Sequence, residues 1–507
     1  MGAAAQAQRR IAIIGSGFSG ICLAIQLKKA GIHSFTIYEK SDRLGGTWRD
    51  NTYPGAACDV PSFLYCFSFE LKRDWSRKWS PQAEIRDYIE HCARAYDIVP
   101  HIRFGTEIAA ARFDAAAGVW RLRTVGGEEI VADVLVSAVG QLNRPSIPAI
   151  PGLERFRGPC FHSARWNHDT HLAGRRVAVI GNAASAIQFI PQIAPTVRHL
   201  SIFQRSANWI LPRGDRAYSA RERRLCTRFP VLARLYRWWI WLEHEGRLPM
   251  IQGKRFAAWS ARRAAEKNLR DQVADPRLRA ALLPDYPIGA KRVLISDDYY
   301  PTLARDNVAL ITEGIADVTE EAIVTRDGVI HRVDVIILAT GFQTTAFLAP
   351  MYITGRSDRT LDEEWADGAH AYRGISVAGF PNLFLMYGPN TNLGHNSIIF
   401  MIECQTRYIV QAIQTLIGRD LATLEIERAA MDAYDRRTQA ELARTVWAAI
   451  RKSWYKTETG RITNNWPGST ARYWWTTRRF DLERYRAEAR HASSDLAAAR
   501  AAAEAAA

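Results

Sequence analysis

Three glycines near the N-terminus, Gly15, Gly17 and Gly20, form a GxGxxG pattern of the kind that binds the pyrophosphate of a dinucleotide. The pattern joins the strand-like run IAIIG to the helix-like run ICLAIQLKKAG, so we expect a tight turn that opens a helix. Glu39 follows at the end of the next strand-like run, where a carboxylate accepts hydrogen bonds from a ribose. A glutamate there favours a ribose without a 2′-phosphate, and hence FAD or NAD.

A second nucleotide-binding pattern occurs in RRVAVIGNAASAIQFIPQIA, residues 175–194. Gly181 holds its first glycine position, but Ala183 stands at the middle one. The Cβ of Ala183 would crowd a pyrophosphate, so either the loop is displaced or the dinucleotide binds more weakly. Arg205 ends the following strand, where a guanidinium can hold a 2′-phosphate. The pattern predicts NADPH at this second site, although Arg205 alone also fits a solvated surface arginine.

The elements around these residues predict an α/β fold with two Rossmann-like dinucleotide-binding domains and a helical insertion. Arg-rich and aromatic stretches such as ARLYRWWIWLEHEGRL indicate helices between the halves, and strand signals return at VDVIILATGF and NLFLMYGP. We therefore expect each domain to be completed from the C-terminal half. The predicted parts are an FAD domain (8–145 and 380–490), an NADP domain (150–213 and 288–379), the helical insertion (214–287) and a C-terminal tail (491–507).

Composition narrows the class of protein. With 507 residues the chain exceeds the size at which one core stops growing, so two or more domains are expected. The net charge of +15 favours anionic ligands such as cofactor phosphates. The basic residues are scattered and no nucleic-acid module is recognisable, which argues against a nucleic-acid partner. Seven cysteines at irregular spacing fit neither a disulfide framework nor a zinc site, so we expect no metal and a cytoplasmic location.

The sequence shows no candidate for a membrane-spanning helix. No run of the sequence approaches the roughly 18 apolar residues of a spanning helix, so stable membrane insertion is not expected. The start MGAAAQAQRR leads directly into a strand-like run, which argues against secretion. The stretch RLYRWWIWLEHEGR combines Trp and Arg in a way that suits a membrane interface, although its apolar residues also suit a channel or a core.

The run GGTWRDNTYPGAACD, residues 45–59, resembles the motif that follows the FAD glycines in Baeyer–Villiger monooxygenases and related class B flavin monooxygenases. Paired glycines let the backbone pass close to a flavin, and Trp48 can cover a ring face. The Tyr-Pro-Gly turn directs Asp59 inward. Without this context Asp59 would be interpreted as a turn residue or a helix cap.

The run FRGPCFHSARWN, residues 156–167, resembles the Baeyer–Villiger fingerprint FxGxxxHxxxW followed by Pro or Asp, and Asn167 departs from it at the last position. The fingerprint is carried by Phe156, Gly158, His162 and Trp166. Simple flavin-containing and N-hydroxylating monooxygenases have Tyr or Phe at the position of Trp166, so the resemblance favours ketone oxidation. It also implies that His162 links the domains and couples their movement rather than transferring a proton.

The stretch PIGAKRVLIS, residues 287–296, resembles the segment that carries the active-site arginine of the same enzymes. The resemblance implies that Arg292 is catalytic and that Lys291 contacts the NADP phosphate. In that chemistry NADPH reduces the flavin, O2 adds at C4a, and the peroxide must remain an anion to attack a carbonyl. Arg292 would stabilise this anion and the charge that grows on the carbonyl oxygen, and Asp59 would hold Arg292 in place.

Three further features complete the resemblance, which extends from Arg10 to about Tyr485. Trp454 resembles a residue that contacts the nicotinamide end of NADP, and a core position fits it equally. GPNTNLGHNS, which contains Asn390, resembles the flavin-contacting loop of the branch near 4-hydroxyacetophenone monooxygenase, and residues 339–341 resemble the ATG strand end of the family. The predicted cofactor-binding residues are Gly15, Gly17, Gly20, Glu39, Gly46, Thr47, Trp48, Asp59, Tyr65, Gly181, Ser185, Gln188, Arg205, Lys291, Asn390 and Trp454.

The sequence therefore predicts a Baeyer–Villiger monooxygenase that holds FAD and uses NADPH and O2 to convert a small ketone into an ester or a lactone. Two alternatives stay open: an S- or N-oxygenating flavin monooxygenase, and a flavoprotein oxidase or binding protein that NADPH reduces poorly because of Ala183. We expect a monomer or a homodimer. No single motif encodes which ketone enters, because pocket shape depends on several loops.

Overall fold

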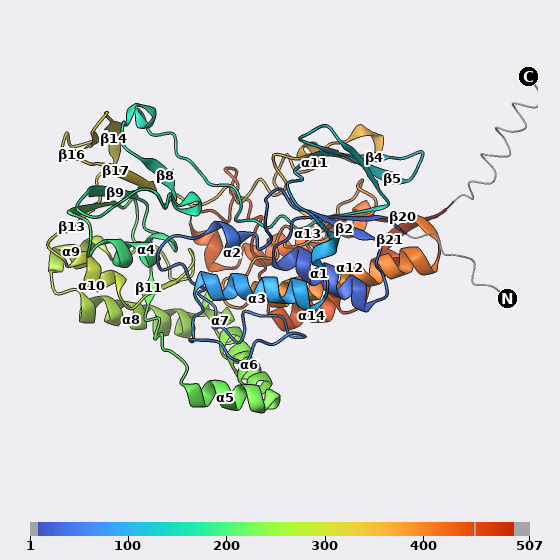
Figure 1. Ribbon diagram of the computed structural model, residues 1–507, viewed down its shortest axis with the longest axis horizontal. Helices are drawn as coiled ribbons and strands as arrows, with labels where there is room; N and C mark the ends of the chain where they lie inside the picture. The colour runs from blue at the N-terminus through green and yellow to red at the C-terminus, as the bar shows by residue number, and fades with distance from the viewer. Residues whose placement is uncertain (1–8, 451–452, 491–507) are drawn as a thin grey trace, which may run out of the picture.

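The computed structural model describes residues 9–450 and 453–490, in which two α/β units lie side by side (Figure 1). The predicted α/β class, with two Rossmann-like units and a helical insertion, is confirmed. The predicted C-terminal tail, residues 491–507, lies outside the described residues.

A parallel five-stranded sheet in the order β19-β7-β1-β2-β3 forms the centre of the first unit. Its strands are β1 (Ile11–Ile14), β2 (Phe35–Tyr38), β3 (Ile102–Arg103), β7 (Val134–Ser137) and β19 (Leu383–Leu385). All four side chains of β1 are buried, as expected for a central parallel strand that is covered on both faces. The helix α1 (Phe18–Lys29) packs against α3 (Gln82–Ala95) and α12 (Ile398–Gly418). Because β19 and α12 belong to this unit, the C-terminal half completes it, as the sequence predicts.

A four-stranded sheet in the order β18-β4-β5-β6 corrects one predicted boundary. Its strands are β4 (Ile108–Asp114), β5 (Val119–Thr124), β6 (Glu129–Ala132) and β18 (Tyr352–Thr354). β18 pairs with β4, and Phe347, Leu348 and Ile353 are buried in the same hydrophobic cluster as β1. The predicted extension of the NADP domain to residue 379 is therefore wrong, because the chain from Phe347 onward packs with the first unit.

The first unit also contains further helices and two paired strands from the C-terminal part of the chain. They are α2 (Thr47–Asp50), α11 (Leu361–Glu364), α13 (Arg428–Leu442), α14 (Thr470–Thr477), β20 (Leu421–Ile426) and β21 (Tyr485–Ala489). β20 and β21 pair antiparallel, and α12 packs against both β20 and α14. In the described parts of the chain, no helix combines the length and the apolar composition that crossing a bilayer requires.

The second unit contains a parallel sheet in the order β13-β10-β9-β17-β8. Its strands are β8 (Cys160–His162), β9 (Arg176–Ile180), β10 (His199–Phe203), β13 (Val308–Ile311) and β17 (Val335–Leu338), with α4 (Ala186–Ile193) and α10 (Tyr299–Leu303) packed together beside them. Between β13 and β17 the chain forms a small antiparallel sheet of β14 (Ile315–Val318), β15 (Ala322–Thr325) and β16 (Ile330–Arg332). The fingerprint run 156–167 thus supplies the edge strand β8 of this sheet.

The region between residues 214 and 287 is helical, as predicted. It consists of α5 (Ala220–Arg228), α6 (Pro230–Glu245), α7 (Leu248–Ile251), α8 (Arg255–Gln272) and α9 (Pro276–Ala281). Two short paired strands flank it, β11 (Ile210–Leu211) before it and β12 (Leu294–Ile295) after it. α8 packs on β11 and α10, so this part of the insertion rests on the second unit.

The chain crosses between the two units twice, and the crossings lie next to each other. Ser146 on the outgoing segment donates its amide to the carbonyl of Gly341 on the returning one, at 2.8 Å. The Thr340 hydroxyl donates to the carbonyl of Ser146 at 2.6 Å. Gly140 and Gly341 both have positive φ, 71° and 80°, in the left-handed region that glycine tolerates. A two-stranded connection of this kind positions the units and can act as a hinge.

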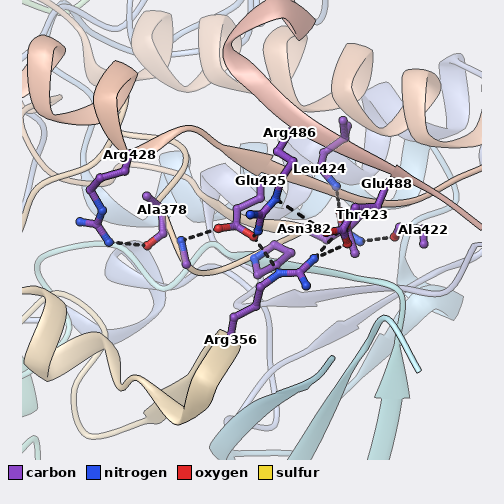
Figure 2. Close-up of polar contacts among 12 residues, drawn as sticks. Arg356, Ala378, Asn382, Ala422, Thr423, Leu424, Glu425, Arg428, Arg486 and Glu488 are labelled. Carbon is purple, nitrogen blue, oxygen red and sulfur yellow. Dashed lines mark hydrogen bonds and ion pairs between the residues drawn. The ribbon is translucent and has the colours of Figure 1, made fainter. Parts of the chain in front are cut away.

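Polar contacts hold the paired strands β20 and β21 on the rest of the first unit (Figure 2). Arg356 donates to Glu425 at 2.8 Å and pairs with Glu488. Asn382 is almost fully buried and bridges three backbone groups: its amide nitrogen donates to the carbonyls of Asp133 and Ala422, each at 2.9 Å, and its oxygen accepts from the amide of Leu424 at 2.8 Å.

Replacing Asn382 by alanine is expected to lower the free energy of unfolding by about 2–3 kcal/mol, because buried backbone groups lose their partners. The φ of 55° at Asn382 adds strain for alanine, so Asn382→Gly separates the lost hydrogen bonds from the strain. Thermal and denaturant unfolding of the purified protein measure both variants. Arg486→Ala, whose side chain is 55% exposed in its ion pair with Glu425, is the control and is expected to cost less than about 1 kcal/mol. Equal stabilities of Asn382→Ala and Arg486→Ala would contradict the prediction.

Candidate active site

One cavity of about 1250 Å³ is lined by residues of both units. It lies at the carboxyl ends of β1 and β9, where the two glycine turns begin, which is where open α/β sheets bind ligands. Pockets for a single small ligand usually measure roughly 300–1,000 Å³, so this cavity is large enough for more than one ligand.

The first glycine turn fits a pyrophosphate. Gly15 has a φ of 104°, and a Cβ there would lie 2.8 Å from the carbonyl oxygen of Ala138. A Cβ on Gly20 would lie 2.0 Å from the carbonyl oxygen of Gly15, so Gly20 permits α1 to pack against the turn. Gly17 and Gly46 face each other across the cavity wall, where a Cβ on Gly46 would approach the Gly17 Cα to 3.2 Å. This close backbone approach matches the cradle that a dinucleotide requires.

Glu39 lies in the cavity wall with both carboxylate oxygens hydrogen-bonded. One accepts from the backbone and hydroxyl of Ser16, at 3.0 and 2.7 Å, and the other from the Ser41 amide and the Arg49 guanidinium, at 3.0 and 2.9 Å. A carboxylate offers about four acceptor positions, and these four donors occupy them. A ribose would therefore replace one of the two side-chain donors, the Ser16 hydroxyl or Arg49.

The predicted flavin-side residues Thr47, Trp48 and Tyr65 also line the cavity. The Trp48 indole donates to the Tyr65 hydroxyl at 3.1 Å, and the two rings meet edge to face at 5.6 Å. Burial raises the pKa of Tyr65, so its hydroxyl stays protonated. The pair forms an aromatic wall with fixed orientation.

The second glycine turn reaches the same cavity through Gly181, Ala183 and Ser185. Gly181 has a φ of 107°, and a Cβ there would lie 2.4 Å from the carbonyl oxygen of Ala339. Ala183 is exposed toward the cavity, so its Cβ meets the ligand space rather than the protein core. Gln188 lines the cavity but also joins the units, since its amide donates to the Ala57 carbonyl at 3.0 Å and accepts from the Tyr53 hydroxyl at 3.0 Å.

Two cations converge on the second unit's part of the cavity. Arg205 and Lys291 both line it, and the Lys291 ammonium donates to the Ser206 hydroxyl at 2.8 Å. Burial and the neighbouring charge of Arg205 lower the pKa of Lys291. Two like charges placed together favour an anion between them, which is the arrangement that a 2′-phosphate would stabilise.

Arg292 and Asp59 form an ion pair in the cavity wall, although 200 residues and more separate them in the sequence. The charge of Asp59 raises the pKa of Arg292, so the guanidinium stays positive. Its side chain keeps 37% of its surface accessible, and this surface faces the cavity. The buried hydroxyls of Tyr387 and Tyr455 lie near it, and burial raises the pKa of both. A fixed cation is thus presented to whatever occupies the cavity.

The structure corrects the prediction for Asn390. Its side chain donates to the carbonyls of Ile462 and Asn465, at 2.9 and 3.2 Å, and is not part of the cavity lining. Its φ of 55° lies in the left-handed region, which asparagine tolerates. Asn392, two residues further on, lines the cavity and accepts a hydrogen bond from the Tyr387 hydroxyl at 2.7 Å.

Sequence reasoning also missed Tyr387 and Gln141. Gln141 donates to the Tyr387 carbonyl at 3.0 Å and accepts from Asn464 at 3.1 Å, and both Gln141 and Tyr387 line the cavity. Gln141 lies four residues after the end of β7, in the connection that corresponds to residues 339–341 after β17. The shared position at the end of a parallel strand is the signal that would have identified it.

None of the four fingerprint residues lines the cavity. A Cβ on Gly158 would lie 2.4 Å from the carbonyl oxygen of Asp334, and Trp166 packs on Phe189 at 5.2 Å. The ring of His162 lies 5.9 Å from that of Phe342, beside the returning crossing. Burial lowers the pKa of His162, which keeps the imidazole neutral near pH 7. Phe156 packs against the core cluster of the second sheet, so this run fixes the sheet beside the hinge.

Trp454 lines the cavity. The sequence left open whether it contacts NADP or lies in the core. Its backbone carbonyl accepts from the Thr344 hydroxyl at 2.6 Å, and its ring contacts that of Tyr455 at 4.3 Å. Trp454 thus stands between a small core cluster and the ligand space.

The two Rossmann-like units share one cavity, which has a cation pair on one side and the Arg292–Asp59 pair between the units. This arrangement is that of an oxidoreductase that brings two dinucleotides together. The sequence profile of the family described as flavin-binding monooxygenase-like matches residues 8–354. The chain therefore belongs to this family.

Curated relatives narrow the assignment within the family. The chain is 44% identical to a Baeyer–Villiger monooxygenase of Pseudomonas aeruginosa over 481 residues, which cover 94% of this chain and 91% of that protein. It is 43% identical to a Baeyer–Villiger monooxygenase of Streptomyces coelicolor, with 94% and 92% of the two chains covered. A solved structure of an oxidized steroid monooxygenase bound to NADP superposes with a TM-score of 0.84 at 30% identity, over 95% of this chain and 99% of that one. The predicted membership of the Baeyer–Villiger group is confirmed.

Proposed function

We propose that this enzyme uses NADPH and O2 to insert one oxygen atom next to the carbonyl of a small ketone, giving an ester or a lactone. The observation that carries the proposal is the cation of Arg292, held by Asp59 in the wall of a cavity that two dinucleotide units share. When bound, FAD accepts a hydride from NADPH and activates O2, which amino-acid side chains cannot do.

Arg292 is the catalytic residue of the proposal. Its guanidinium remains charged because Asp59 raises its pKa, and it binds the ketone oxygen and stabilises the negative charge that grows there. Asp59 is a positioning residue, since it fixes the guanidinium and does not itself meet the ketone. Tyr387 and Tyr455 stay neutral, so they add hydroxyl groups without adding charge.

The positions of the residues in the cavity wall support the following cofactor-binding roles. On the FAD side, the glycine turn would hold the pyrophosphate, Glu39 a ribose, and Thr47, Trp48 and Tyr65 the flavin end. On the NADPH side, Gly181 and Ser185 would approach the pyrophosphate, Arg205 and Lys291 the 2′-phosphate, and Trp454 the nicotinamide end. With both cofactors bound, these walls would shield the space between them from water, which protects reactive species there.

The test is product formation from a panel of ketones. The yellow holoenzyme receives NADPH without oxygen while the flavin absorbance is followed, and then O2 with cyclohexanone, phenylacetone or a long-chain ketone. Fast bleaching followed by an ester or lactone supports the proposal. Oxidation of an added sulfide or amine without any ester from a ketone would assign the enzyme to heteroatom oxygenation. Absence of bleaching by NADPH, when dithionite still reduces the flavin, would reject the monooxygenase function.

Ala183→Gly is expected to tighten NADPH binding by about threefold to tenfold, because the exposed Cβ of Ala183 points into the space where the pyrophosphate would lie. The rate of anaerobic flavin reduction against NADPH concentration gives the dissociation constant. Ala173→Gly, in an exposed turn of the same unit that does not line the cavity, controls for added backbone freedom. If both variants bind NADPH equally, the Cβ of Ala183 does not crowd the ligand.

We also propose a cytoplasmic location and a monomeric or homodimeric state. The seven cysteines are all unpaired, and five of them are buried, which suits a reducing compartment. Size-exclusion chromatography with light scattering determines the oligomeric state, and fractionation of the source cells determines the location.

A further inference from the structure

The helix α6 is apolar on two opposite sides. Its inner side is buried through Ala233, Ile240 and His244, at helical spacing. The outer side is apolar as well, although it is exposed to solvent. The exposed large residues of this side are Val231, Leu232, Leu235, Trp238, Trp239 and Leu242. An apolar side that no other element covers has the composition of a contact surface.

The outer side is a continuous stripe. Val231, Leu235, Trp238 and Leu242 follow the spacing of three and four residues that places side chains on one face of a helix. Trp238 and Trp239 are 58% and 60% exposed, far more than tryptophan usually is. Figure 1 shows α5 and α6 extending away from the sheets at the edge of the molecule. The stripe is therefore accessible to a large partner.

Basic residues accompany the stripe. The exposed arginines of α5 and the start of α6 are Arg221, Arg223, Arg224, Arg228 and Arg234. The carboxylates at the two ends of this helix pair are already neutralised, Glu222 by Arg216 at 2.8 Å and Glu243 by Arg247 at 3.0 Å. The surface therefore carries an excess of positive charge next to its apolar stripe, within a chain of net charge +15.

We propose that the α5–α6 surface, formed by this stripe and these arginines, docks the enzyme on an anionic lipid surface. Tryptophan and leucine side chains enter the interface between headgroups and acyl chains, and the arginines pair with lipid phosphates. A second copy of the chain is a poorer occupant, because a contact between two copies through this surface would bring two surfaces of net positive charge together.

The inner side of α6 connects the docking surface to the cavity. Arg237 donates to the carbonyls of Phe63 and Leu64, at 2.8 and 3.0 Å. Glu245 accepts from the Asn396 amide at 2.8 Å, and Asn396 lines the cavity. Docking through the outer side thus holds the cavity close to the lipid surface while the fold stays outside the bilayer.

The test is sedimentation of the yellow holoenzyme with vesicles. Wild-type enzyme is expected to sediment with vesicles of phosphatidylcholine and phosphatidylglycerol, much less with phosphatidylcholine alone, and less at high salt. Trp238→Ser combined with Trp239→Ser is expected to lower binding at least about tenfold. Arg223→Gln combined with Arg224→Gln is expected to lower binding to the anionic vesicles by roughly fivefold per arginine.

Each variant has a matched control elsewhere on the surface. Trp474→Ser with Trp475→Ser removes two exposed tryptophans of α14, and Arg436→Gln with Arg437→Gln removes two exposed arginines of α13. Both controls are expected to bind vesicles as wild type does. Flavin absorbance and melting temperature verify that every variant is folded, independently of turnover.

Three results would overturn the proposal. One is a wild-type enzyme that remains in the supernatant with every vesicle. Another is an equal loss of binding in the α6 variant and its α14 control. The third is a dimer in sedimentation velocity that the Trp238 and Trp239 substitutions convert into a monomer while vesicles remain unbound, which would assign the surface to a second copy.

Discussion

Replacing Arg292 by alanine is expected to lower the rate of ester formation by about a thousandfold while NADPH still reduces the flavin. The guanidinium is the fixed cation that meets the developing charge on the ketone oxygen, and loss of one such group from a dry site costs roughly 10²–10³ in rate. The larger value is expected because the variant leaves the Asp59 carboxylate without its partner in the cavity wall. NADPH consumption should continue with release of hydrogen peroxide instead of ester.

The measurement compares ester yield with NADPH consumed under air, together with anaerobic bleaching. Arg292→Lys retains the charge but not the planar guanidinium and is expected to recover a small part of the activity. Asp59→Asn should lower ester formation less than Arg292→Ala does, because it weakens the positioning of the cation without removing it. A variant without Arg292 that forms ester at the wild-type rate would remove this residue from the mechanism.

The central strands could be predicted because their signals are local. β1 and β9 are short runs of buried aliphatic residues, each followed at once by a glycine turn and a helix. The end of the NADP domain could not, because β18 has three residues and pairs with β4, which lies more than two hundred positions earlier. An edge strand of this length has no periodicity, and only its partner defines it.

The residues of the site also differ in whether a local sequence pattern identifies them. Gly15 and Glu39 belong to one local pattern, whereas Arg292 and Asp59 meet only in the folded chain and were identified by family resemblance. Asn390 and Asn392 differ by two positions in one loop, and nothing in GPNTN tells which of them faces the ligand. Only the folded chain decides it, because the Asn390 side chain donates there to the carbonyls of Ile462 and Asn465, more than seventy positions later.

Removal of both cations near the second glycine turn should abolish the preference for NADPH over NADH. Arg205 and Lys291 lie together in the cavity wall, and each charge-assisted hydrogen bond to a phosphate contributes about 1.5–3 kcal/mol. Arg205→Ala combined with Lys291→Ala is therefore expected to raise the KM for NADPH by roughly 10²–10⁴-fold. The KM for NADH, which has no 2′-phosphate, should change little. Arg198→Ala, at the opposite end of β10, is the control and should change neither value.

The same pair predicts how NADPH affinity depends on pH. Burial and Arg205 lower the pKa of Lys291 in the free enzyme, so the ammonium loses its proton at a lower pH than an ordinary lysine. The phosphate dianion favours the protonated form, so NADPH binding should take up a proton in this range. The KM for NADPH should therefore rise as pH increases through the lowered pKa, while that for NADH stays level. Lys291→Arg, which remains charged, should flatten the rise. A profile that stays as steep in Lys291→Arg would show that another group titrates, and equal pH profiles for NADPH and NADH would show that the pair does not bind the 2′-phosphate.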